Sequence, residues 1–119
     1  MKVLTIKEPW ASMILNGEKT IETRTWRTKY RGLCLLHASK NPRSEISGKI
    51  FAVAKIVDCK PMTQDDELPA KCPIYPGAYS FFLEEVRPTE LKEIKGQLGL
   101  WEINCELVEK GEGMSCLFG

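Results

Sequence analysis

The stretch KIFAVAKIVDC, residues 49–59, is the longest candidate strand in the chain and decides the class of fold. In an extended segment successive side chains point to opposite faces, so residues of one parity share a face. From Ile50 to Ile56 one parity carries isoleucine and alanine, and from Phe51 to Val57 the other carries mainly phenylalanine and valine. Both faces are apolar, which is typical of a strand that is covered on both sides. The stretch is therefore predicted to run through the centre of a sheet or barrel.

Shorter extended segments lie on both sides of this strand, separated by turns that contain glycine or proline. A short helix is expected between Pro9 and Gly17, because apolar residues recur there at helical spacing and glycine suits a helix end. The expected strands are 3–6, 20–26, 33–38, 49–59, 78–88 and 100–108, and the loop at 60–77 has room for a second short helix at 63–67. The pattern predicts a mainly β fold with short helices (α+β), and the strand spacing favours a small β-barrel.

Length and hydropathy restrict the chain to a single domain without a membrane span. With 119 residues it is long enough for one compact domain and too short for two. No apolar run approaches the ~20 residues that a membrane-spanning helix needs. Lys2 and Lys7 interrupt any signal-type apolar core at the N-terminus, so a cytoplasmic location without a membrane partner is expected.

The five cysteines show no metal-binding or redox motif. No two of them have C-x-x-C spacing, and His37 is the only histidine. Zinc sites need paired cysteine or histidine ligands at close spacing, so neither a metal nor another cofactor is expected. All five cysteines are expected to be reduced thiols, as in cytosolic proteins. A nucleophilic site made of Cys59, His37 and Asp58 has no support from their spacing.

Charge is distributed unevenly along the chain, although the net charge is only +1. Residues 19–49 contain eight basic and two acidic residues, a net of +6, whereas residues 58–119 contain six basic and twelve acidic residues, a net of −6. Such a division suggests a basic face and an anionic partner. The alternative is that folding intermixes the two blocks in space, and the sequence does not decide between them.

The stretch GEKTIETRTW, residues 17–26, contains the pattern G-x-K-x-x-E-x-R and the strongest candidate site residues. Lys19 is either a solvated side chain after the helix or a group that contacts a phosphate, or acts as a base if burial lowers its pKa. Glu22 and Arg24 share one face of a strand. Either they form an ion pair that only braces the strand, or Arg24 holds Glu22 in a cleft where it accepts a hydrogen bond from a base edge.

Trp10, Trp26 and Lys40 are further candidates for ligand contact. The two tryptophans flank the motif, and each ring either stacks on a nucleobase or belongs to the core. Lys40 follows the apolar segment 33–38 and is a candidate phosphate contact. His37, at the end of that segment, is expected to be a structural group.

An ordered set of seven short matches resembles the ASCH family, the activating-signal-cointegrator homology domains. The resemblance extends from about Leu4 to Leu107 and is much more specific than the G-x-K-x-x-E-x-R string alone. It is strongest to the branch found in a eukaryotic transcription coactivator. The matching segments are PWAS (9–12), GEKTIETRTW (17–26), TKYRG (28–32), HASKNP (37–42), DC (58–59), IKG (94–96) and LW (100–101).

The resemblance implies a PUA-like β-barrel, related to domains that bind RNA in modification enzymes, with a cleft lined by the motif. One domain is expected at 1–107, and the glycine-rich segment 108–119 is expected to be a peripheral tail. The sequence does not decide whether Glu84 or Glu85 faces the cleft. The expected ligand is RNA, a nucleotide or a nucleoside, and the expected ligand-binding residues are Trp10, Lys19, Glu22, Arg24, Trp26 and Lys40.

Members of this family have been assigned nucleic-acid binding, RNA cleavage and hydrolysis of N4-acetylcytidine, so enzymatic activity stays open. The hydrolases have a lysine in the place of Lys19 and a threonine where this chain has Glu22. That departure removes the expected hydroxyl nucleophile, and neither Thr20 nor Thr23 holds the matching place. If the protein is an enzyme, Lys19 and Glu22 are the expected catalytic residues. The coactivator branch implies a further alternative, a protein-interaction module.

Overall fold

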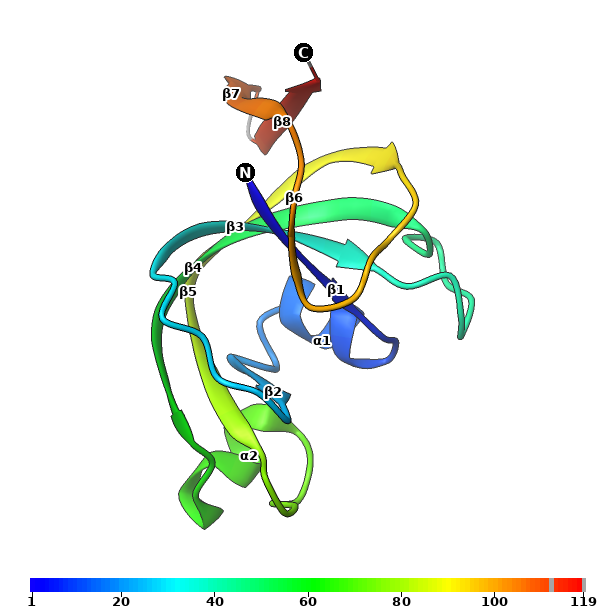
Figure 1. Cartoon of the computed structure of the whole chain (residues 1–119). Coiled ribbons are helices and arrows are strands. Elements are labelled where there is room, and N and C mark those ends of the chain that lie inside the picture. The colour runs from blue at the N-terminus through cyan, green and yellow to red at the C-terminus, as the bar shows by residue number, and fades with distance from the viewer. Residues whose placement is uncertain (112, 119) are drawn as a thin grey trace.

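The computed structural model describes residues 1–111 and 113–118 and shows a mostly β chain with two short α-helices, as the sequence predicts (Figure 1). None of the described helices is long and apolar enough to cross a membrane. The helices are α1 (Trp10–Leu15) and α2 (Glu67–Ala70), which follows a 3-10 turn, η1 (Gln64–Asp66). The strands are β1 (Lys2–Ile6), β2 (Ile21–Arg24), β3 (Gly32–Ala38), β4 (Lys49–Pro61), β5 (Tyr79–Glu93), β6 (Leu100–Glu102), β7 (Cys105–Lys110) and β8 (Gly113–Phe118).

The strands form a mixed sheet that is open. Their order is β6-β1-β3-β4-β5-β8-β7, and β2 pairs with β5 off this path. β1 runs parallel to β3, and β5 runs parallel to β8 at a single bridge, whereas the other pairs are antiparallel. In the described residues β6 and β7 end the order without pairing to each other. The prediction of a closed barrel is therefore wrong, although the sheet is curved.

The curvature comes from the two longest strands. β4 and β5 span 13 and 15 residues, and their pairing shifts register at three places between Ile50 and Asp58. Such bulges bend a sheet and increase its twist. Figure 1 shows β4 and β5 arching around α1. The far part of β5 pairs with β8, through Thr89 and Met114, and not with a strand that would return to β6. The sheet is thus bent without being closed.

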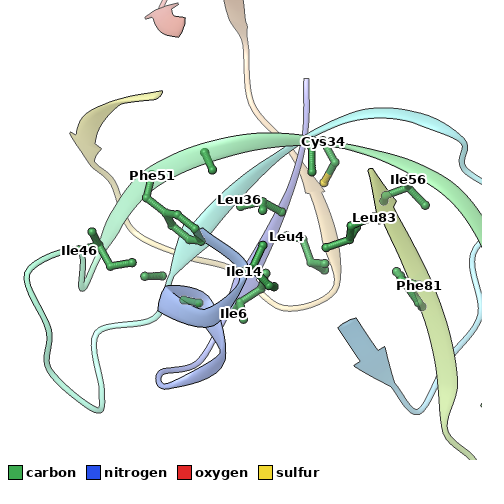
Figure 2. Close-up of a cluster of buried hydrophobic side chains, with 14 residues drawn as sticks. Leu4, Ile6, Ile14, Cys34, Leu36, Ile46, Phe51, Ile56, Phe81 and Leu83 are labelled. Carbon is green, nitrogen blue, oxygen red and sulfur yellow. The ribbon is translucent and has the colours of Figure 1, made fainter. Parts of the chain in front are cut away.

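β4 occupies the central position that its two apolar faces predict. It lies between β3 and β5, and residues 50–54 are all buried. Phe51 belongs to the larger core cluster, with Leu36 of β3 (Figure 2). Ile50 and Val53 lie in a second cluster with Trp101 of β6, so the predicted division of β4 by parity is wrong here, where the pairing shifts register between Ile50 and Ala52. Apolar side chains on both faces are therefore covered, as expected for a fully buried strand.

Helix α1 covers the concave side of the sheet and fixes the start of the candidate site. Ile14 is fully buried and lies among Leu4 and Ile6 of β1 (Figure 2). The Glu8 carboxylate, just before the helix, accepts hydrogen bonds of 2.8 Å and 2.6 Å from the backbone N–H and the hydroxyl of Ser12. The predicted helix is confirmed, and its packing leaves Trp10 at the edge of the core.

The C-terminal segment forms a hairpin joined by a disulfide. The sequence pattern predicts one strand at 100–108, but the chain breaks into β6 and β7, and β8 returns along β7. Cys105 and Cys116 form a disulfide across this pair, so the expectation of five reduced thiols is wrong for these two residues. An odd cysteine count carries no information on which residues face each other across a hairpin. Cys116 is fully buried in the second cluster.

Counting reactive thiols tests this arrangement. Cys34, Cys59 and Cys72 are free, and burial raises the pKa of the Cys34 thiol to about 12. We expect a thiol reagent at pH 8 to modify Cys59 and Cys72 in the folded chain and to leave Cys34 unmodified, because the thiolate is the reactive form. Denaturation without a reductant should expose three thiols and denaturation with one should expose five. Mass spectrometry counts the adducts, and five thiols without a reductant would contradict the disulfide.

Candidate functional site

A cleft of about 570 Å³ lies between the start of α1, strand β2 and the loop that joins β5 to β6. The three motif residues that the sequence singles out, Lys19, Glu22 and Arg24, all line it. The remaining lining residues come from five parts of the chain and are Thr5, Lys7, Trp10, Thr23, Ser39, Cys72, Pro73, Tyr75, Gln97 and Leu98.

The local fold brings the motif residues to one place. Gly17 ends the helix with a φ of 86°, a conformation that glycine adopts easily, and its N–H donates to the carbonyl of Ile14. The chain then turns, and β2 pairs with the start of β5, with Glu22 opposite Phe81. Alternation along β2 directs Ile21 into a buried apolar cluster and Glu22 into the cleft.

Glu22 lies between two cations. Its Oε2 accepts hydrogen bonds from Nη2 of Arg24 at 2.8 Å and from Nε of Arg24 at 3.1 Å. Its Oε1 lies 3.5 Å from Nζ of Lys19. Each cation also donates to a backbone carbonyl, Lys19 to Ala70 and Arg24 to Thr5, the latter at 2.6 Å. The ion pair between Arg24 and Glu22 is thus present, and it lies on the wall of the cleft.

Burial makes this cluster unusual. The side chain of Lys19 is 1% exposed, that of Glu22 is 9% exposed and that of Arg24 is 21% exposed. Desolvation lowers the pKa of Lys19, and the neighbouring Glu22 carboxylate opposes that shift. The cluster carries a net charge of +1 when all three groups are ionised. It can therefore attract an anion, and Oε1, whose contact with Nζ of Lys19 is long at 3.5 Å, can also accept a hydrogen bond from a ligand.

The two tryptophans differ in position. Trp10 is half-buried and lines the cleft, and its indole N–H donates to the carbonyl of Lys71 at 3.4 Å. Trp26 instead packs edge-on against Phe81, with ring centroids 5.1 Å apart, and it lines neither this cleft nor the cavity beside it. Trp26 thus packs against the larger core cluster.

Lys40 and His37 line that second cavity, which has a volume of about 720 Å³. Lys40 is exposed. His37 is buried, and both of its ring nitrogens are engaged: Nδ1 lies 3.1 Å from the hydroxyl of Thr5, and Nε2 lies 2.7 Å from the carbonyl of Ile94. These contacts agree with the structural role that the sequence predicts for His37. Neither Glu84 nor Glu85 lines either cavity.

Some lining residues have no signal in the sequence. Tyr75 lies in a proline-rich loop, and its hydroxyl donates to Oγ1 of Thr23 at 3.0 Å. Gln97 and Leu98 lie in a loop that no pattern connects to the motif. Thr5 gives a weak signal, because it is the polar residue in the apolar run 3–6. Among the described residues, no group of three or more potential metal ligands comes together.

A curved, open, mixed β-sheet with a short helix on its concave side lies beside a cleft that holds a lysine, a glutamate and an arginine. The sequence profile of the ASCH domain matches residues 4–95. The chain belongs to the ASCH family, as its short motifs predict.

Relatives and a solved structure agree with this assignment. The chain is 29% identical over 70 residues to activating signal cointegrator 1 from human, and equally to that from mouse. The match covers 58% of this chain but only 12% of each relative, so the chain corresponds to a small part of those proteins. The crystal structure of a mutant of the ZmASCH protein from Zymomonas mobilis superimposes with a TM-score of 0.58 over 78% of this chain and 75% of that chain. At 13% identity, that likeness shows the fold alone.

Proposed function

We propose that this ASCH domain binds RNA or a nucleotide in the cleft between α1, β2 and the loop from β5 to β6. The observation that carries the proposal is the buried cluster of Lys19, Glu22 and Arg24 on the wall of a cleft. Placing three charged groups away from water is costly, and apolar side chains of similar size fold as stably or more stably. Such a cluster is therefore better explained by a ligand than by folding alone.

The chemistry of the cleft supports a nucleotide. Oε1 of Glu22 has capacity to accept a hydrogen bond from an exocyclic amine of a base. The ring of Trp10 offers a surface for stacking, which is insensitive to sequence. Lys7 lines the cleft, is exposed and forms no ion pair in the described part of the chain, so it is available for a phosphate.

Truncating Trp10 is the direct test. We expect wild-type protein to bind a short single-stranded RNA, with an affinity that falls steeply between 50 and 200 mM salt, as contacts to phosphates require. Trp10→Ala should weaken binding by about tenfold, the loss expected for one stacked base. Fluorescence anisotropy with labelled RNA measures both effects.

Phe118→Ala is the matched control, because Phe118 is an exposed aromatic residue in the C-terminal hairpin and lines neither cavity. It should bind RNA as the wild-type chain does. Absence of RNA and nucleotide binding at low salt would refute the proposed function. Equal losses in both variants would remove Trp10 from the site.

A hydrolase is the second candidate, and one observation favours it. Thr23 and Lys19 line the same cleft, and burial lowers the pKa of Lys19, as a general base requires. The enzyme would act on N4-acetylcytidine or on RNA, with Lys19 and Glu22 as the catalytic residues. Incubation with each substrate, beside Lys19→Ala, tests it: turnover that disappears in the variant supports the hydrolase, and no turnover on either substrate counts against it.

A protein-interaction role is a third candidate. It rests on the name of the human and mouse relatives, activating signal cointegrator 1, of which this chain matches a small part. A protein partner that associates stably in the absence of nucleic acid would favour it over the nucleotide site.

A further inference from the structure

The second cavity adjoins the first along a shared wall. Thr5, Ser39, Gln97 and Leu98 line both spaces, which have volumes of about 720 and 570 Å³. Each volume lies within the range of cavities that hold small ligands. The two cavities therefore meet along these four residues, which we call the seam.

Two lysines at the second cavity are available for an anion. Lys40 enters it from the end of β3, and Lys95 enters it from the loop after β5. Both are exposed, and in the part of the chain that the structure describes neither forms an ion pair. Glu93 is the acidic residue that lines the same cavity, so the charged side chains there sum to +1. Phosphate contacts from lysine carry no base preference.

The loop at 94–99 is fixed at one end and open at the other. The ring of His37 contacts the carbonyl of Ile94 at 2.7 Å, and the N–H of Ile94 donates to the carbonyl of Gly48 at 3.0 Å. A Cβ on Gly96 would lie only 2.8 Å from the His37 ring, so the loop passes that ring too closely for a residue with a side chain. Leu98, by contrast, is 98% exposed at the seam. The loop thus holds an apolar side chain where the two cavities meet.

We propose that the two cavities are subsites for consecutive nucleotides of one single-stranded RNA. This inference rests on the proposed function and specifies its ligand. The first nucleotide occupies the cleft beside Glu22 and Trp10. The second occupies the adjoining cavity, where Lys40 and Lys95 contact its phosphates and Leu98 packs against a base or ribose at the seam. The exposed amide of Gln97 is at the same seam, where it can hydrogen-bond a ribose 2′-hydroxyl, the group that distinguishes RNA from DNA.

The test compares ligands of one and two nucleotides on the intact chain. Isothermal titration calorimetry with 5′-cytidine monophosphate and the ribodinucleotide pCpC should give at least about tenfold tighter binding for pCpC, since a second base adds stacking and packing. Lys40→Ala and Lys95→Ala should each weaken pCpC, and each should reduce the slope of log affinity against log salt by about 0.7, the value for one lost phosphate contact on a single strand. Both variants should bind the mononucleotide as the wild-type chain does.

Lys29→Ala is the matched control. Lys29 is exposed and forms no ion pair in the described part of the chain. It precedes the start of β3, whereas Lys40 of the second cavity follows the end of that strand. The control should bind both ligands normally. Equal affinity for pCpC and the mononucleotide, or equal losses on both ligands in Lys40→Ala, would overturn the second subsite and leave the first standing. Equal binding of the deoxy dinucleotide would overturn the assignment to RNA. If neither ligand binds, the proposed function and this inference fall together.

Discussion

Glu22→Gln is expected to lower the free energy of unfolding by about 3 kcal/mol or more at pH 7, and the melting temperature by on the order of 10 °C. The carboxylate of Glu22 lies between Nζ of Lys19 and the guanidinium of Arg24, and Lys19 is almost fully buried. An amide of the same shape leaves both cations without their counter-charge, and an uncompensated buried charge is costly. Urea denaturation and a thermal melt measure the change.

The control for this variant is Glu84→Gln. Glu84 is an exposed residue of β5 without an ion pair among the described residues, so its change should be within about 0.5 kcal/mol of zero. Titration with the four nucleotides then separates the roles of Glu22. If it also reads a base amine, the variant loses base discrimination by ~1–3 kcal/mol. An unchanged melting temperature would show that the carboxylate does not hold the two cations.

Phe81→Ala is expected to cost about 3–5 kcal/mol, which is the usual loss for removing a buried phenylalanine ring. Phe81 is fully buried in the larger core cluster (Figure 2). It contacts Trp26 edge-on and lies opposite Glu22 in the pairing of β2 with β5. Truncation leaves a cavity under the strand that carries the motif. We therefore expect weaker RNA binding together with the loss of stability, both measurable on one sample by urea denaturation and anisotropy.

Phe118→Ala, the binding control, serves for stability as well, because the ring is exposed and its removal should cost less than about 1 kcal/mol. A small effect of Phe81→Ala on stability would mean that the core relaxes around the missing ring. A large loss of stability with unchanged affinity would mean that β2 keeps its place without Phe81.

The central strand and the motif were predictable because each depends on local pattern. Two apolar faces place β4 between neighbours, and alternation along β2 puts Glu22 and Arg24 on one side. The position of Trp26 was not predictable in this way. Polar neighbours in the sequence suggest an exposed ring, but the contact that places it is with Phe81, in a strand far along the chain.

Local sequence pattern also could not predict whether the sheet closes or which cysteines form the disulfide. Strand spacing is the same for a closed barrel and for an open, bent sheet. Which of the two forms depends on the strand that pairs with the C-terminal part of β5. It pairs with β8, in the segment that the sequence presents as a glycine-rich tail. The disulfide joins residues 11 positions apart across that hairpin, and cysteine spacing shows it only once the turn is known.

The placement of β1 has a consequence for the order in which the molecule assembles. β1 pairs with β3 on one side and with β6 on the other, and the indole N–H of Trp101 donates to the hydroxyl of Thr5, 96 positions away in the chain. Contacts between such distant residues are slow to form, because a long loop must close before any of them is made. During synthesis from the N-terminus, one edge of β1 therefore stays unpaired until residues 100–102, which form β6, have left the ribosome. Gln97 and Leu98, which line the proposed nucleotide site, directly precede β6, so that proposed site is also completed late.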